Sequence, residues 1–360
     1  MMQNHLLFAP ANIKSIRSAV NSIFEQITPI INGGRVLRII FFGNSKNNEE
    51  YVADKAAVEE SLRDLPFNIM PVWSFVAQPP FESPLAAEVW WDELDWRLEE
   101  RHCNDIRYIL MTNDEAKRIL VGGLNELDKG RIYDQTKAIC DTISAILQQE
   151  EMPIDSIVRQ WNYIERITFE DQENQHYQEF NDARSELYSQ CEWVDGYPAA
   201  TGIGALAGGV TIDFDAVVGL PVAAIDNKMQ VAAHAYSKDV LLGEKSQKTT
   251  PKFERAKLTS DMLYISGTAA IRGEESLVGV SAAEQTRITL ENIDELLRES
   301  ECGAARTLRV YIKHKEDFEQ IRDVVEGYAP HDALYIFADI CRDELLVEIE
   351  SVAYKGWFCL

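Results

Sequence analysis

The pattern of apolar and polar positions predicts an α/β protein. The run Val36–Gly43 is continuously β-branched or aromatic, which predicts a buried strand, and the spacing of apolar residues over Glu49–Leu65 predicts a helix. Further along, Tyr133–Gln149 has the spacing of a helix and Ile157–Ile164 that of a strand. Strands and helices therefore alternate along the chain.

The order of these elements repeats in the second half of the chain. Corresponding helices and strands lie about 150 residues apart, far more than a solenoid period, which indicates a duplicated domain. The repeated unit, β-β-α-β-α-β-β, closes as a mixed sheet with two helices on one face. We therefore divide the chain into an N-terminal α/β segment (1–100), a first unit (101–250) and a C-terminal unit (251–360).

Three further segments stand out. The tryptophan-rich stretch Val89–Trp96 is predicted to be the apolar face of a helix on the core, because large aromatic side chains are mostly buried. The glycine-rich stretch Ala199–Gly204 lacks the spacing of a phosphate-binding loop, which favours a strand with a close backbone approach. The polar stretch Ser237–Pro251 predicts a surface loop or a lid.

Composition narrows the choice of partners. Hydrophobic residues make up 46% of the chain, enough for a folded core, and 35 Lys and Arg against 59 Asp and Glu give a net charge of −24. Such acidity argues against nucleic acid and anionic membranes as partners. No apolar stretch reaches the roughly 18 residues of a membrane-spanning helix. The six cysteines and six histidines form no metal-binding motif, so we expect a cytoplasmic protein with reduced thiols, no metal and no cofactor.

The segment Leu345–Val352 carries candidate acid–base chemistry. Side chains alternate along a strand, so Glu348 and Glu350 project from one face. Two close carboxylates raise the proton affinity of at least one of them, and a carboxyl group that stays protonated near pH 7 is suited to general-acid catalysis. The alternative is a solvated strand face with two ordinary glutamates.

Two other places are candidates for ligand contact. Ile265–Ile271 ends an apolar strand in small residues, which let a ligand approach the backbone while Ser266 and Thr268 donate hydrogen bonds; the alternative is a tight strand-to-loop transition. Cys341 precedes Arg342, and a neighbouring cation lowers the pKa of a thiol. A buried, inert cysteine is the alternative for that position.

Seven motifs occur together in an order that resembles the chorismatases, enzymes that cleave the enolpyruvyl ether of chorismate and are built from RidA-like domains. The resemblance covers roughly residues 157–354. The motifs lie at 159–164, 176–184, 198–204, 251–256, 264–269, 284–293 and 338–350. The resemblance implies two RidA-like mixed-sheet units that follow the N-terminal segment in the chain. It also implies a homotrimer, because this fold usually buries its open sheet face by trimerising.

The resemblance also implies roles for particular residues. Glu348 corresponds to the general acid that protonates the methylene carbon of the enolpyruvyl group, with Glu350 as its electrostatic neighbour. The substrate is a small dianion, and release of pyruvate follows protonation. The remaining site positions implied by the resemblance are Cys341, Tyr236, Lys238, Gly267, Thr268, Ala269 and Lys313.

Some positions depart from the family pattern, and two of them favour different reaction products. Lys238 and Lys313 stand where the family commonly has arginine, and lysine makes no planar bidentate contact to a carboxylate. Cys341 resembles the branch that makes hydroxybenzoates, which favours 3-hydroxybenzoate, whereas Ala269 resembles the hydrolytic branch that makes a dihydroxycyclohexadiene carboxylate. The alternatives are a RidA-like small-molecule binding protein and, less favoured, an imine deaminase, because 332–337 lacks the arginine that such deaminases use.

Overall fold

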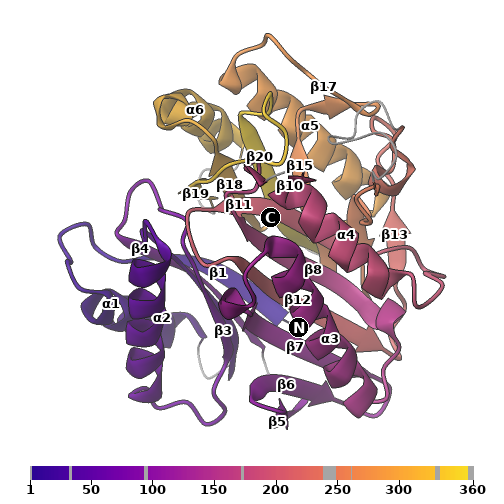
Figure 1. The fold of residues 1–360 in the computed structure, drawn as a ribbon. Coiled ribbons are helices and arrows are strands. Elements are labelled where there is room, and N and C mark those ends of the chain that lie inside the picture. Colours follow the sequence, from indigo (N-terminus) through magenta and orange to yellow (C-terminus); the bar gives the residue numbers. More distant parts are fainter. Residues whose placement is uncertain are drawn as a thin grey trace.

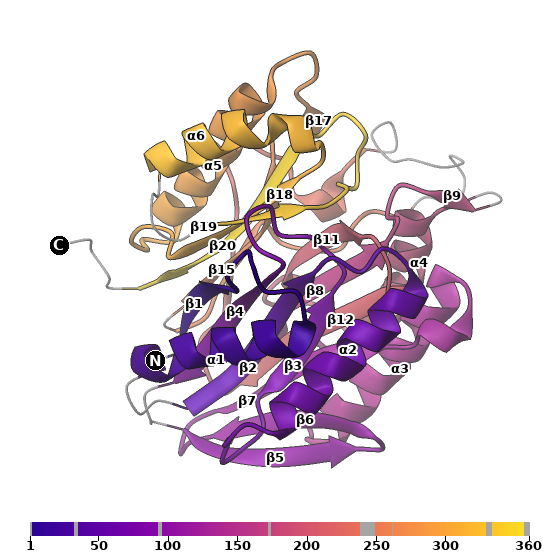
Figure 2. The ribbon, with the colours of Figure 1, turned by 90° about the vertical axis from the view of Figure 1, so that its left-hand side faces the viewer.

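Three mixed β-sheets pack against one another around the centre of the molecule, each with two helices on its outer face (Figures 1 and 2). The computed structural model describes residues 2–31, 35–92, 96–171, 174–237, 249–260, 262–328 and 333–355. The mixed α/β class expected from the sequence is confirmed.

The first sheet has the strand order β1-β4-β2-β3. Its strands are β1 (Met2–Phe8), β2 (Arg35–Gly43), β3 (Val72–Val76) and β4 (Leu85–Asp92), and its helices are α1 (Ile16–Ile31) and α2 (Asn48–Arg63). Asn47 caps helix α2: its side chain accepts a hydrogen bond from the backbone N–H of Glu50, so an orphan donor of the first turn is satisfied.

The second sheet has the order β11-β8-β12-β7-β6-β5. Its strands are β5 (Arg97–Cys103), β6 (Ile106–Thr112), β7 (Lys117–Asn125), β8 (Ile157–Glu165), β11 (Ala199–Ala205) and β12 (Val210–Val218), with helices α3 (Ile132–Gln149) and α4 (His176–Tyr188). A small hairpin of β9 (Glu170–Asp171) and β10 (Asn174–Gln175) precedes α4.

The third sheet has the order β13-β14-β15-β20-β18-β19. Its strands are β13 (Ala223–Ile225), β14 (Ala256–Leu258), β15 (Met262–Ala269), β18 (Thr307–Ile312), β19 (Ala333–Phe337) and β20 (Val347–Tyr354), with helices α5 (Ala282–Glu299) and α6 (Phe318–Tyr328). A hairpin of β16 (Ile271–Arg272) and β17 (Glu275–Ser276) follows β15.

The strand orders support the duplication and extend it. The second and third sheets correspond strand for strand, β12 matching β20 and β8 matching β18, and the first sheet repeats the four strands at one end of that order, with β3, β2, β4 and β1 matching β11, β8, β12 and β7. The N-terminal segment is thus a third unit of the same kind, which the sequence analysis did not predict. The boundaries at residues 100 and 250 remain our proposal for the domains.

One apolar cluster joins all three sheets. Trp90 of the first sheet, Trp161 of the second and Tyr264 of the third lie with ring centroids 6.2–6.5 Å apart. Three other clusters fill the space between each sheet and its own helices. The inner faces of the three sheets therefore cover one another within a single chain. Burial of an open sheet face, the reason for expecting a homotrimer, thus does not require partner subunits, and the trimer stays a prediction.

The described part of the tryptophan-rich stretch, residues 89–92 and 96, is not helical, and the prediction of a helix was wrong. Leu85–Asp92 forms β4, and every residue of that strand is buried. A central strand that is covered on both faces shows a continuous apolar run without period-2 alternation, and periodicity alone does not distinguish such a run from a buried helix.

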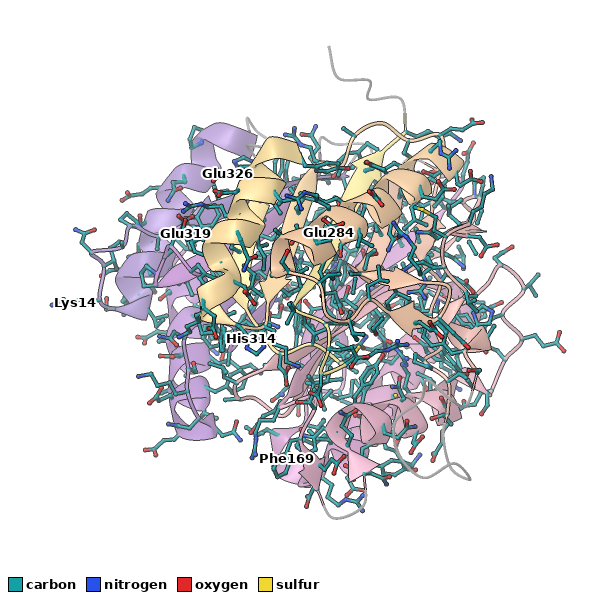
Figure 3. All side chains as sticks on the ribbon, turned by 90° about the horizontal axis from the view of Figure 1, so that it is seen from above. Lys14, Phe169, Glu284, His314, Glu319 and Glu326 are labelled. Atoms are coloured by element: carbon teal, nitrogen blue, oxygen red, sulfur yellow. The ribbon has the colours of Figure 1, made fainter. Side chains whose placement is uncertain are left out.

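Acidic side chains lie exposed on the outer helices. Figure 3 shows Glu319 and Glu326 on the outer side of α6, where both side chains are exposed. Lys238 and most of the predicted loop 237–251 lie outside the described residues. In the described part of the chain no helix is long and apolar enough to cross a membrane.

Candidate active site

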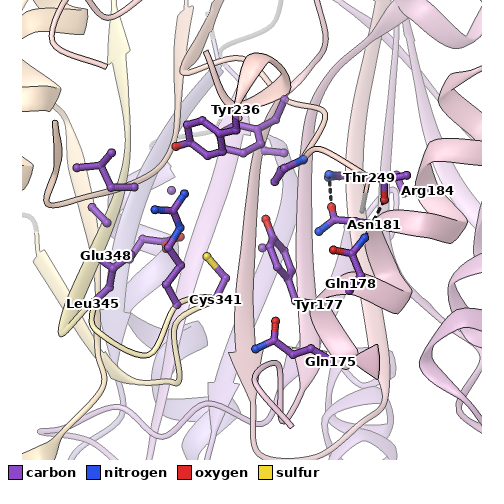
Figure 4. A pocket seen from close by; sticks show the side chains of 18 of the residues that line it. Gln175, Tyr177, Gln178, Asn181, Arg184, Tyr236, Thr249, Cys341, Leu345 and Glu348 are labelled. Carbon is purple, nitrogen blue, oxygen red and sulfur yellow. Dashed lines mark hydrogen bonds between the residues drawn. The ribbon is translucent and has the colours of Figure 1, made fainter. Parts of the chain in front are cut away.

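A pocket opens where the second and third units meet (Figure 4). It encloses about 870 Å³, including the part open to solvent. Helix α4 and β11 supply one wall, and β15, β20 and the segment before β20 supply the other. The lining residues used below are Tyr177, Arg184, Tyr236, Arg255, Gly267, Ala269, Cys341, Arg342 and Glu348.

Glu348 reaches this pocket because Gly267 leaves room for its carboxyl group. Strand β15 is bulged between Ile265 and Thr268 where it pairs with β20, and Gly267 lies in that bulge. A Cβ atom at residue 267 would come within 2.0 Å of Glu348 Oε1. The small residue at the end of this strand therefore makes room for the Glu348 carboxyl group, in addition to any room that it leaves for a ligand.

Glu350 lies on the same face of β20 but is enclosed by donors. Arg159 Nη2 contacts its Oε2 at 2.6 Å, Arg309 Nη1 contacts its Oε1 at 2.7 Å, and Trp161 Nε1 donates to Oε1 at 3.1 Å. The hydroxyl of Thr201 donates to it as well. Two guanidinium groups and two neutral donors hold this carboxylate ionised.

The two glutamates are therefore driven apart in proton affinity. Burial, and then the negative charge of Glu350, raise the pKa of Glu348 to about 8, although Arg255 and Arg159 oppose the shift. For Glu350 burial is the largest influence and raises the pKa, but Arg309 and Arg159 with the Thr201 hydroxyl outweigh it, so its pKa lies below the usual value. At pH 7 Glu348 is a neutral acid beside an anion, which is the state that proton donation requires.

Three arginines line the pocket. Arg184 and Arg255 are buried, and Arg342 is half-buried. Their hydrogen bonds go to neutral acceptors: Arg184 to Asn181 Oδ1 (2.8 Å), Arg255 to the hydroxyl of Tyr236 and to a backbone carbonyl, and Arg342 to a backbone carbonyl and a serine hydroxyl. Among the described residues, none of the three forms an ion pair with a carboxylate. The pocket is suited to a small anion.

The structure brings some of the predicted site residues together and separates others. Tyr236, Gly267, Ala269 and Cys341 line the pocket with Glu348. Thr268 is buried and its hydroxyl donates to the Ser266 carbonyl, while Ser266 itself bonds to Glu254 and Ala200, so both hydroxyls are used within the fold.

Lys313 does not lie with Glu348. Its ammonium contacts Asp339 Oδ1 at 3.2 Å and Asp343 Oδ1 at 3.3 Å. It lines a second cavity together with Phe169 and His314, both labelled in Figure 3. Of the cations that do line the pocket, Arg184 was a weaker candidate from its place in the motif at 176–184, whereas Arg255 and Arg342 were missed as ligand contacts, although both stand within motifs that carried the resemblance.

Cys341 faces the pocket as a thiol. Burial, and then the charge of Glu348, raise its pKa to about 12, and the adjacent Arg342 only partly opposes them. Arg342 does act to lower the pKa of this thiol, as expected, but burial and Glu348 outweigh it, so the net shift is upward. Cys341 is therefore a weak hydrogen-bond donor at neutral pH and no thiolate nucleophile.

Within the described ranges no group of three or more His, Cys, Asp or Glu side chains is placed to hold a metal ion. The ionisable side chains among the described lining residues are one carboxyl, one thiol, two tyrosines and three guanidinium groups, beside the amides of Gln175, Gln178 and Asn181 and the Thr249 hydroxyl. These groups combine a carboxyl of raised pKa with cations that are suited to an anionic ligand.

Comparison with known proteins identifies the class of enzyme that carries this site. Residues 88–216 match the family described as chorismatase FkbO/Hyg5-like, N-terminal, and residues 244–355 match the family endoribonuclease L-PSP. A crystal structure of a chorismatase superimposes with a TM-score of 0.73 at 22% identity and covers 98% of both chains, which shows the fold.

Two curated relatives place the chain further. A 3-hydroxybenzoate synthase of Streptomyces hygroscopicus is 31% identical over 246 residues, which are 62% of this chain and 70% of that protein. A chorismatase of Streptomyces rapamycinicus is 30% identical over 219 residues, which are 55% of this chain and 64% of that protein. The chain belongs to the chorismatase family and is an enzyme, which decides against the alternative of a purely binding protein.

Proposed function

We propose that this enzyme cleaves the enolpyruvyl ether of chorismate and releases pyruvate, with Glu348 as the general acid. The observation that carries the proposal is a buried carboxyl group, whose pKa is raised to about 8, in a pocket where the other charged side chains of the described residues are three arginines. The names of the relatives supply the substrate class.

The chemistry needs a proton at carbon. Glu348 gives its proton to the methylene carbon of the enolpyruvyl group, which becomes a methyl group and leaves an oxocarbenium-like centre beside the ether oxygen. The carboxylate left on Glu348 is then stabilised by Arg255 and Arg159, the two cations that already oppose its raised pKa. The low proton affinity of Glu350 keeps it from competing for that proton.

Two outcomes complete the reaction. If water adds to the cationic centre, the ether bond breaks to give pyruvate and a dihydroxycyclohexadiene carboxylate, and one water molecule is consumed. If instead the neighbouring ring hydroxyl loses its proton and attacks the ring carbon that bears the ether, that C–O bond breaks and its electrons form the carbonyl of pyruvate. The resulting epoxide opens with loss of the ring proton to give 3-hydroxybenzoate, and no net water is consumed. We favour 3-hydroxybenzoate, because Cys341 faces the pocket and one relative is a 3-hydroxybenzoate synthase. Ala269, the marker for the hydrolytic branch, lines the same pocket.

Chorismate carries two carboxylates, and we assign their recognition to the pocket arginines. Guanidinium groups bind carboxylates in a planar, bidentate way, which a lysine does not reproduce. Arg255 lies against the ring of Tyr236 (5.5 Å), and Arg342 covers the same ring at 5.1 Å, so these cations are held in place by an aromatic side chain. Lys238 and Lys313, the cations expected from the resemblance, are not needed for this assignment.

The test is incubation of the purified protein with chorismate. Pyruvate is measured by coupling to lactate dehydrogenase, and the ring product is identified by mass spectrometry. We expect pyruvate and 3-hydroxybenzoate in equal amounts. Absence of pyruvate above background at millimolar chorismate would contradict the proposal, and a dihydroxycyclohexadiene carboxylate as the main product would contradict the choice of branch.

A further inference from the structure

Three buried arginines occupy equivalent positions on the corresponding strands β2, β8 and β18, and surround the ring of Trp161. Each pairs with a carboxylate that another sheet supplies. The pairs are Arg38 with Asp215 (2.7 Å), Arg159 with Glu350 (2.6 Å), and Arg309 with Glu88. A closed ring of ion pairs therefore links the three units at the centre of the molecule.

Glu88 is the contribution of the N-terminal sheet to this ring. It lies on β4 and is 2% exposed, and Asn4 of the neighbouring strand β1 donates to it. Its other oxygen accepts from Arg309 Nε, while Nη1 of the same arginine contacts Glu350 at 2.7 Å. Arg309 is thus shared between an anion of the first unit and the anion that stands beside Glu348.

We propose that Glu88 is a positioning residue of the active site, which acts through Arg309 and Glu350 to keep Glu348 protonated at neutral pH. The inference rests on the proposed function only in taking Glu348 as the acid. It assigns a task to the N-terminal unit, which contributes no residue to the lining of the pocket.

The reason is a balance of buried charge. Three arginines of the ring face the carboxylates of Glu88, Asp215 and Glu350, which match them in number. The carboxyl groups left over are Asp213 and Glu348, and the pKa of each is raised, chiefly by burial. If Glu88 loses its charge, the ring gains a net positive charge, and the ionised form of Glu348 becomes more favourable.

Other titratable groups also face Glu348, and none of them compensates for Glu88. Those acting on it or titrating beside it are Glu350, Arg255, Arg159, Cys341 and Tyr177. Arg309 is faced by Glu88, Glu350, Tyr163 and Tyr311. The two tyrosines are neutral at neutral pH, because burial raises their pKa far above the usual value. Of these four groups, only the carboxylates of Glu88 and Glu350 therefore carry a charge that acts on Arg309 at neutral pH.

The expected effect follows from Coulomb's law. Loss of a unit charge at roughly 10 Å in a medium of effective dielectric constant about 20 moves a pKa by about one unit. Glu88→Gln should therefore shift the alkaline limb of kcat/KM to lower pH by about one unit. Arg309→Gln removes a cation from the same ring and should move the limb to higher pH.

The matched control is Asp92→Asn. Asp92 lies on the same strand β4, is fully buried, and pairs with Arg35 at 2.6 and 3.0 Å. Within the part of the chain that the structure describes, it forms no hydrogen bond or ion pair with Arg309. It should lower stability and leave the alkaline limb in place. Glu88→Asp keeps the charge and should restore most of the wild-type profile.

A second readout needs no turnover. Infrared titration of the protonated carboxyl band, assigned to Glu348 by subtraction of the Glu348→Gln spectrum, gives the midpoint directly. We expect the midpoint to fall in Glu88→Gln and rise in Arg309→Gln. An unchanged midpoint in Glu88→Gln, or shifts of the same sign in both variants, would overturn the inference. If the wild type releases no pyruvate but the midpoints move as expected, the proposed function fails and the coupling stands.

Discussion

Glu348→Gln should change how the stability of the protein depends on pH. In the folded wild type the pKa of Glu348 is raised from 4.5 to about 8, so between these values the folded state holds a proton that the unfolded chain has released. The free energy of unfolding then falls as pH rises, because the unfolded state binds fewer protons. Glutamine at this position does not titrate, so the variant lacks this contribution.

The magnitude follows from the size of the shift. Each pH unit within this window contributes about 1.36 kcal/mol, and the window is about three and a half units wide, so the full contribution is roughly 5 kcal/mol. It is fully present below pH 4.5 and lost above pH 8. Between pH 5 and 8 the stability difference between wild type and variant should change by roughly 4 kcal/mol in favour of the variant.

The measurement is urea unfolding of both proteins at half-unit steps from pH 5 to 9. Other titrating groups, including Asp213, are common to both proteins and cancel in the difference. A difference that stays constant across this range would refute a raised pKa at Glu348. A constant difference is the result expected if Glu348 is ionised in the folded state, because neither state then takes up or releases a proton at this position over most of the range.

Three further predictions concern the pocket. Gly267→Ala should lower kcat/KM by about 100-fold, because the new Cβ would lie 2.0 Å from Glu348 Oε1 and displacing a catalytic group by about 1 Å has roughly that cost. The control is Gly327→Ala, whose new Cβ meets no atom within 4 Å and should leave activity unchanged. An equal loss in both variants would contradict the argument. Arg255→Gln should raise KM for chorismate at least about tenfold, whereas Arg287→Gln on the outer side of α5 should not; steady-state kinetics would disprove the assignment if the two were alike. Cys341→Ala should keep pyruvate release and lower the proportion of 3-hydroxybenzoate among the products, and an unchanged product ratio would show that Cys341 does not determine which product forms. At pH 7 the wild-type thiol should react slowly with iodoacetamide, because its pKa is about 12.

The catalytic pair was readable from the sequence because it depends on local geometry. Alternation along a strand places Glu348 and Glu350 on one face whatever the rest of the chain does. The pattern left open which glutamate is protonated, because that depends on Arg159 and Arg309, which lie about 190 and 40 residues away in the sequence. Most helices and strands of the second and third units were predicted for the same local reason.

Other features depend on contacts between units, which periodicity does not encode. Val89–Trp96 was predicted as a helix because its residues 89–92 belong to β4, a strand that is covered on both faces and so shows no alternation. Lys313 was placed at the substrate by its position in a motif, yet Asp339 and Asp343 hold it elsewhere. Glu88 carried no signal at all, because its partner Arg309 stands 221 residues further along the chain.

The most direct test of the central claim follows the proton itself. Chorismate is converted in D2O with lactate dehydrogenase and NADH present, so that pyruvate is trapped as lactate before its methyl group exchanges. If Glu348 protonates the methylene carbon, the lactate carries one deuterium in its methyl group, and Glu348→Gln yields no lactate above background. Lactate with an unlabelled methyl group, or undiminished release from Glu348→Gln, would contradict the account.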